Sequence, residues 1–330
     1  MAAEQHWAGA RERGSLLGMR LLIAIHSIGG GWLFRLSLAP VVCFYGIVHA
    51  GARRASLDYL WRMHRFNPAF PRPRPWHVIR HLWSFAVTLH DKFAVWKGEL
   101  RRDDVALYHS EIIDELLAAR RGALILISHL GNFEICQALS QTRPKLRLTV
   151  LQHTAHAAKF NRVLGGYNRD SAVELLQVAD LDIAAAIRLN EKITAGEFIA
   201  IAADRVAIDN AAKSATRDFL GHPAHFPAGP FALAMALQAP VLTVHCIKQG
   251  GRYHIHFDYL WRGGAVVRRQ RDERRDALID AYVTRLETFC LAAPWQWYNF
   301  FPFWASAQAP QPGGAPRPPS TRPTKDTLPP

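Results

Sequence analysis

The chain has 330 residues, 49% of them hydrophobic, and a formal net charge of +13. That length allows one large α/β domain or two small ones, and the apolar content excludes a chain that is disordered throughout. The positive balance predicts an anionic partner: a phospholipid surface, an acidic carrier protein or nucleic acid. The charge alone does not choose among the three.

Residues 1–65 contain a strongly apolar segment, Leu21 to Ala50, which Arg35 interrupts and Pro40 bends. Its longest uncharged run, residues 36 to 52, is at the lower limit of the roughly 17 to 25 residues that cross a bilayer. Arginines flank both ends: Arg11, Arg13, Arg20, Arg53, Arg54 and Arg62. We therefore expect an apolar, membrane-associated helical segment that lies on anionic headgroups as a hairpin or in-plane helix. The alternative is two ordinary core helices.

The run NPAFPRPRP, residues 67 to 75, predicts an extended connector because its prolines cannot continue a helix or an inner strand. Beyond it, short apolar runs alternate with amphipathic ones. We expect strands at 123–128, 148–151, 198–202, 240–245 and 253–257, the last a half-exposed edge, and helices at 111–120, 179–194, 230–238 and 274–291. This order predicts an α/β domain over residues 66–304, with helices on the faces of its sheet. The Pro-rich tail, residues 305–330, is expected to be disordered.

Four cysteines lie far apart in apolar stretches and form no paired motif: Cys43, Cys136, Cys246 and Cys290. This pattern predicts reduced, buried thiols in a cytosolic setting and no catalytic thiol.

The stretch Ile127-Ser-His-Leu-Gly-Asn-Phe-Glu134 places a histidine at the end of an apolar strand, followed by a turn. Asn132 is expected to cap the helix that begins FEICQAL. Because the turn separates His129 from that helix, the Glu134 carboxylate could hydrogen-bond one ring nitrogen and leave the other to accept a proton. The alternative is a structural histidine.

The stretch His129-Leu-Gly-Asn-Phe-Glu134 resembles the H-x4-D/E box of the lysophospholipid and glycerolipid acyltransferase superfamily. Its particular residues are similar to those of the branch that contains the late lauroyl and myristoyl acyltransferases of lipid A biosynthesis. Three further blocks match in order: Ala202-Ala-Asp-Arg205, the FLGHPAHFPAGP run at 219–230, and the closing PWQWYNFFPFW at 294–304. Arg205 departs from the Asp-Gln or Asp-His pair common in the family. The resemblance covers about residues 6 to 304 and implies a mixed, mostly parallel sheet.

The resemblance also implies transfer of a fatty-acyl group from acyl-carrier protein or acyl-CoA to a hydroxyl or amine of a membrane lipid or glycolipid. His129 would be the general base, paired with Glu134. Asn132, Asp204, Arg205, Arg217 and Gly229 are the expected substrate-binding residues. Gly229 and Pro230 open a helix whose free N–H groups could hold an anion. Asp204 could equally cap a helix or pair with Arg205, and Arg217 could equally be a solvated side chain.

No cofactor, metal or nucleic acid is expected. The histidine pairs at 153/156, 222/225 and 254/256 lack acidic or thiol ligands at a zinc spacing. No nucleophile elbow, phosphate loop or dinucleotide fingerprint is present. We expect an enzyme at the cytoplasmic face of a bacterial inner membrane. The competing interpretation is a non-catalytic basic protein that binds membrane or nucleic acid.

Overall fold

The computed structural model describes residues 33–34, 36–96, 102–140, 146–152, 173–177, 183–206 and 214–304. The first 32 residues, His153, His156 and the tail at 305–330 lie outside this part.

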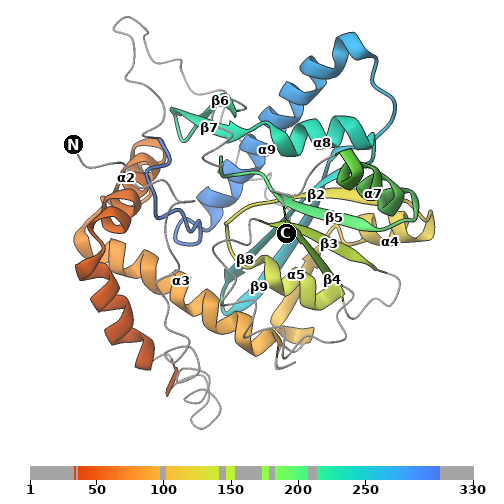
Figure 1. The fold of residues 1–330 in the computed structure, drawn as a ribbon. Coiled ribbons are helices and arrows are strands. Elements are labelled where there is room, and N and C mark those ends of the chain that lie inside the picture. The colour runs from red at the N-terminus through yellow and green to blue at the C-terminus, as the bar shows by residue number, and fades with distance from the viewer. Residues whose placement is uncertain are drawn as a thin grey trace, which may run out of the picture.

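A seven-stranded sheet with strand order β1-β9-β8-β2-β5-β3-β4 forms the centre of the molecule (Figure 1). Its strands are β1 (Val105–Tyr108), β2 (Ala123–Ile127), β3 (Leu148–Gln152), β4 (Val173–Gln177), β5 (Phe198–Ala202), β8 (Val241–Gln249) and β9 (Arg252–Trp261). Every neighbouring pair is parallel except β8–β9. The expected mixed, mostly parallel sheet is therefore confirmed. β9 lies between β1 and β8, so the expectation that it forms an edge was wrong.

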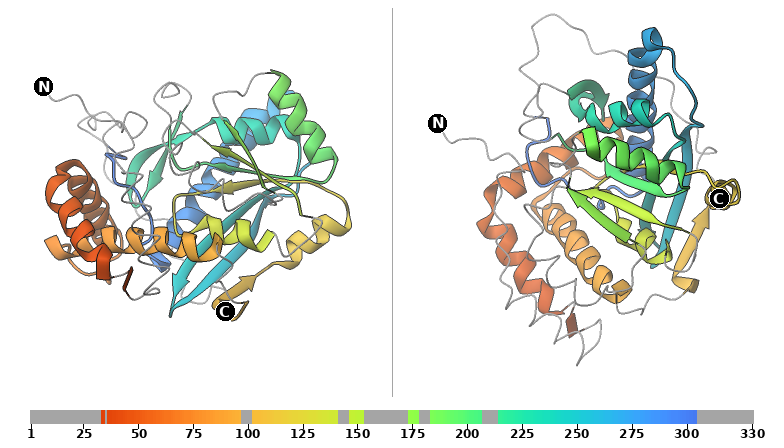
Figure 2. Two further views of the ribbon diagram at one scale, coloured as in Figure 1. Left: turned by 60° about the horizontal axis from the view of Figure 1, so that its bottom comes forward. Right: turned by 45° about the vertical axis from the view of Figure 1, so that its right-hand side comes forward.

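Strands β2 and β5 consist of apolar residues almost throughout because both faces of the sheet are covered. Alternate side chains of β2 enter different cores: Leu124 and Leu126 face one, and Ile125 and Ile127 face the other. The helices α7 (Ile183–Thr194), α8 (Gly229–Leu237) and α9 (Arg271–Ala292) cover the first face. The helices α4 (Glu111–Ala118) and α5 (Phe133–Ser140), with the end of α3 (Pro75–Trp96), cover the second (Figure 2).

A two-stranded hairpin, β6 (Ser214–Phe219) with β7 (His222–Pro227), packs beside α9. Its buried residues Phe219, Ala224 and Phe226 belong to the same core as α8 and α9. Sequence analysis expected no strands here. The hairpin continues that core beyond the main sheet.

The N-terminal region contains the helix Leu36–Val48 and α2 (Ala50–Phe66). Within the described residues, no helix taken singly has the length and apolar content to cross a membrane; these two reach that threshold only as a pair bent by 92°. Arg53 donates to the carbonyl of Gly46 at 2.8 Å and so caps the first helix at the bend. Leu38 and Val42 are buried in the core, whereas Phe44 and Ile47 are exposed.

The cysteines are all unpaired, as expected. Cys246 and Cys290 are buried and Cys136 is partly buried. Cys43 is exposed, which contradicts the expectation that all four are buried. It lies on the helix Leu36–Val48, whose outer face is apolar and exposed, so an apolar sequence did not imply burial there.

Candidate active site

The candidate site lies at the carboxyl ends of two neighbouring parallel strands. Ile127 ends β2, Ala202 ends β5, and these two residues are register partners. His129 and Asp204 each follow two residues later, so the sheet brings them to the same edge. The carboxyl edge of a parallel sheet is where α/β proteins commonly bind ligands.

Asp204 accepts three hydrogen bonds and is completely buried. Its Oδ1 lies 2.8 Å from Nδ1 of His129, and its Oδ2 accepts from the His129 backbone N–H at 2.8 Å. The indole N–H of Trp297 donates to Oδ2 at 3.1 Å. Burial alone would raise the pKa of Asp204, but His129 and Arg205 lower it to about 2. The group is therefore a carboxylate at neutral pH.

The electrostatic surroundings of His129 keep its ring neutral. Its pKa is lowered, first because the ring is withdrawn from water and then because of the positive charge of Arg205. Asp204 acts in the opposite direction, and Lys92 adds to the lowering. The withdrawal from water is only partial, since 37% of the side-chain surface remains exposed and the ring is accessible at this edge of the sheet.

The loop that carries His129 is held by backbone hydrogen bonds to two other segments. Gly131 donates to the carbonyl of Gln296 at 2.8 Å, and Asn132 donates to that of Cys246 at 2.9 Å. The His129 carbonyl accepts from the Tyr298 N–H at 3.0 Å. Gly131 has φ +71°, and a Cβ there would lie 1.7 Å from the Cys246 carbonyl oxygen. Only glycine can occupy this position without displacing β8.

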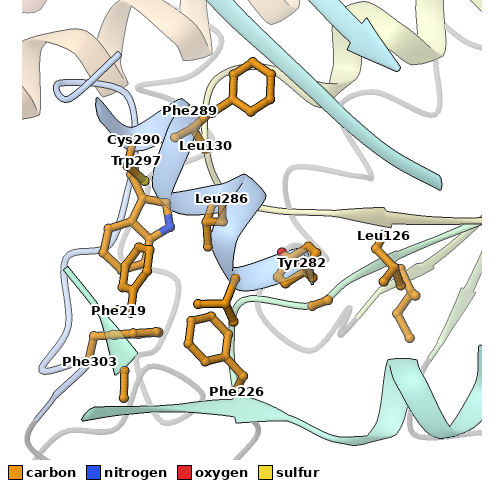
Figure 3. Close-up of a cluster of buried hydrophobic side chains, with 14 of the residues drawn as sticks. Leu126, Leu130, Phe219, Phe226, Tyr282, Leu286, Phe289, Cys290, Trp297 and Phe303 are labelled. Carbon is orange, nitrogen blue, oxygen red and sulfur yellow. The ribbon is translucent and has the colours of Figure 1, made fainter. Parts of the chain in front are cut away.

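The closing aromatic segment joins the site to the main core. Trp297 is fully buried and meets Phe219 at 5.2 Å and Phe303 at 5.0 Å between ring centroids. Figure 3 shows its indole beside Cys290 of α9 and above Phe219 and Phe303. The N–H of this buried indole therefore links the Asp204 carboxylate to the core.

Glu134 does not occupy the expected place beside His129. Its carboxylate forms an ion pair with the ammonium group of Lys92 at the end of α3. Sequence analysis gave Glu134 the hydrogen bond to one ring nitrogen of His129; in the structure Asp204 makes it, to Nδ1. The physical reason is that Glu134 lies in the first turn of α5, which packs against α3. Asp204 instead follows β5, the strand beside β2 in the sheet, and so lies next to His129.

The other expected substrate-binding residues have different surroundings. Arg205 follows Asp204, donates to the Tyr298 carbonyl at 2.7 Å and lies over the Phe301 ring at 5.3 Å. Asn132 is buried within the loop. Arg217 lies on the β6–β7 hairpin and forms ion pairs with Asp276 and Asp280 of α9.

Gly229 begins α8 as expected, with Pro230 in its first turn. No hydrogen bond or ion pair in the described part of the chain joins Gly229 or Arg217 to His129. Across the same residues, no group of three or more His, Cys, Asp or Glu side chains could hold a metal ion.

A model of the bacterial lipid A biosynthesis acyltransferases matches residues 77–306. The chain belongs to this family.

Two curated relatives, the phosphatidylinositol mannoside acyltransferases of Mycobacterium tuberculosis strains H37Rv and CDC 1551, are each 25% identical over 138 residues. The match covers 42% of this chain and 42% of each relative.

In this member of the family, sequence analysis identified His129 as the candidate base but missed Asp204 as its hydrogen-bond partner. A signal was present, since the His and the Asp each stand two residues after the end of a buried apolar strand. Equal offsets from adjacent parallel strands bring side chains together. The link from Trp297 to Asp204 had no such signal, because it depends on tertiary packing.

Proposed function

We propose that this acyltransferase moves a fatty-acyl group from a thioester to a hydroxyl or amine of a membrane-associated lipid or glycolipid, with His129 as general base. Nε2 of His129 takes the acceptor's proton as the acceptor oxygen or nitrogen attacks the thioester carbonyl carbon. The carbon–sulfur bond then breaks, and the thiolate receives that proton from Nε2. The thiol is a good leaving group, so no covalent enzyme intermediate is required.

The hydrogen bond from Nδ1 to Asp204 is the observation that carries this proposal. Because Asp204 is a carboxylate with a pKa of about 2, it can only accept, and Nδ1 must carry the ring proton. Nε2 then has the free lone pair that a base needs. The lowered pKa of His129 keeps this lone pair available at neutral pH.

Two cations lie within electrostatic range of the ring, Arg205 and Lys92. We propose that they stabilise negative charge that develops on the thioester oxygen or is carried by the substrate. Glu134 would then act on the chemistry indirectly, because its ion pair holds Lys92 in place.

The donor is proposed to be acyl-carrier protein or acyl-CoA, and the enzyme to lie at the cytoplasmic face of a bacterial inner membrane. Family membership supports a lipid or glycolipid acceptor. So do the names of the mycobacterial relatives, which give phosphatidylinositol mannoside as their acceptor. The net charge of +13 suits an acidic carrier protein and anionic lipids alike.

The test is a reconstitution with purified full-length protein. Acyl-carrier protein and CoA, each loaded with the same acyl chain, are offered with a bacterial lipid extract, and products are identified by mass spectrometry. We expect an acceptor that gains one acyl group with the parent protein and not with His129→Ala. No acylated product from either donor, or equal product from both proteins, would refute the proposal.

A further inference from the structure

Five arginines lie over tryptophan rings on one surface of the molecule, which we call the Arg–Trp surface. The guanidinium carbons of Arg74, Arg80 and Arg62 lie 4.9, 4.3 and 4.5 Å from the ring centroids of Trp76, Trp295 and Trp304. Arg72 and Arg65 share Trp61, at 5.5 and 6.0 Å. Tryptophan is the side chain that interacts best with a cation over its face.

Four of the five arginines of the Arg–Trp surface are exposed, and the stretch that carries them has charge of one sign. Arg65, Arg72, Arg74 and Arg80 are exposed, and Trp76 is 56% exposed. From Tyr59 to His90 the sequence contains these five arginines and no Asp or Glu. Asp58 pairs with Arg62 and is the nearest acidic residue before this stretch. The surface therefore attracts anions.

An exposed apolar surface adjoins it. The helix Leu36–Val48 packs on α3 at Gly46, where an added Cβ would lie 2.7 Å from Ile79. Figures 1 and 2 show this helix, α2 and the start of α3 on the same side of the molecule. Its outer face holds six of the eleven large hydrophobic side chains that are exposed in the described chain: Leu36, Val41, Phe44, Tyr45, Ile47 and Val48.

We propose that the Arg–Trp surface and this apolar face together dock the protein on an anionic phospholipid bilayer. Arginines would bind headgroup phosphates, the exposed Trp76 ring would lie at the headgroup level, and the apolar face would enter the acyl boundary. The adjacent apolar face favours a bilayer over an acidic protein, because a basic protein-docking surface needs no such exposed helix. The proposal does not depend on the acyl-transfer chemistry.

Docking in this way would also bring the reaction site close to the lipid. Trp295 lies beneath Arg80, and two residues later Trp297 binds Asp204, the partner of His129. One short segment therefore joins the Arg–Trp surface to the base.

The experiment is co-sedimentation of the full-length protein with vesicles of equal parts phosphatidylcholine and phosphatidylglycerol, and with vesicles of phosphatidylcholine alone. The variant replaces Arg65, Arg72, Arg74 and Arg80 by Gln. The control replaces Arg188, Arg268, Arg269 and Arg271 by Gln, which removes the same charge from α7, from the short 3-10 helix Arg268–Gln270 and from the start of α9. These four arginines are exposed, and Figure 1 shows α7 and the start of α9 on the opposite side from α2.

We expect the variant to bind the anionic vesicles at least about tenfold more weakly than the parent, and the control to bind within about threefold of it. Phe44→Gln with Ile47→Gln should weaken binding to both kinds of vesicle. His129→Ala should bind as the parent does, which separates docking from chemistry. Equal losses in variant and control would overturn the proposal. So would a variant that keeps vesicle binding but loses binding to purified acyl-carrier protein.

Discussion

At the scale of single residues, the three hydrogen bonds to Asp204 decide how His129 can react. Two come from His129 itself, one from its ring and one from its backbone, so both the position and the rotation of the imidazole are fixed. The third, from Trp297, is a second hydrogen bond to Oδ2, in a place where water does not reach. A buried carboxylate needs such partners, since an unpaired one would be strongly destabilising.

Replacing Asp204 by Asn should reduce the acyl-transfer rate by about two to four orders of magnitude. The amide keeps the size of the side chain but can donate to Nδ1, which would move the ring proton to Nε2 and remove the base. Glu134→Gln is the matched variant, because it tests the carboxylate that the sequence suggested. We expect a smaller loss there, since Glu134 binds Lys92 rather than the ring. Single-turnover rates measure both, and a larger loss in Glu134→Gln would contradict the assignment.

The candidate base, His129, could be identified from sequence, whereas its hydrogen-bond partner Asp204 could not, for a physical reason. His129 stands in a local pattern of strand, turn and helix that is visible over a few residues. The contact with Asp204 spans 75 residues and exists only because β2 and β5 are neighbours in the sheet. Glu134 is close in sequence, but the start of α5 turns it toward α3.

At the scale of elements, the loop between β2 and α5 depends on β8 and on the closing segment. The side-chain amide of Gln296 joins the closing segment to β8: it accepts from the Lys248 N–H and donates to the Lys248 carbonyl, both at 2.8 Å. Its own backbone carbonyl accepts from Gly131. The loop is thus fixed from two sides, and the position of His129 follows from that.

Gly131→Ala should therefore reduce activity by at least about tenfold and lower thermal stability, because a Cβ would collide with the Cys246 carbonyl. Gly250→Ala is the control, since Gly250 also has a positive φ, +57°, but nothing lies within 4 Å of an added Cβ. Gly250→Ala should lower the free energy of unfolding only by the cost of a left-handed backbone conformation, about 1–2 kcal/mol. Equal effects of the two substitutions on activity, after correction for folded fraction, would contradict the role of the close approach.

The five expected strands, the four helices expected by range and the helix expected to begin FEICQAL all exist, with ends that differ by a few residues from those predicted. These elements carry continuous or periodic apolar runs. The β6–β7 hairpin was missed because only alternate residues near its turn are buried and prolines stand in β7. β1 and β4 were missed as well; they are the two edge strands of the sheet, with exposed positions that weaken the apolar pattern. Composition could not show which face of the helix Leu36–Val48 is covered.

At the scale of the whole molecule, buried histidines make the folded state sensitive to acid. His245 and His256 are cross-strand partners in β8 and β9, and both pack against the Phe289 ring of α9. Burial lowers the pKa of His245 to about 3 and that of His256 to about 4. His81, between α2 and the closing segment, has a pKa lowered to about 4 by burial. All three are neutral in the folded protein at pH 7.

The free energy of unfolding should therefore fall as the pH drops below about 6.5. Each folded-state pKa lies below the unfolded value of 6.5, so the unfolded chain binds more protons in this range. Stability is fully present above pH 6.5 and is lost toward the folded-state values, by up to about 1.4 kcal/mol per pH unit for each histidine. Urea unfolding between pH 7 and pH 5 measures the slope. His245→Phe should flatten it, whereas the exposed His109→Asn should not; parallel slopes for all three proteins would contradict the assignment.

The most direct test of the account is the single-turnover rate of acyl transfer by His129→Ala, with circular dichroism and vesicle binding as controls for fold and docking. Because His129 holds the free Nε2 at the sheet edge while Asp204 only orients it, we predict a rate about two to four orders of magnitude below the parent, with fold and docking unchanged. A rate within about tenfold of the parent would show that another group removes the acceptor's proton.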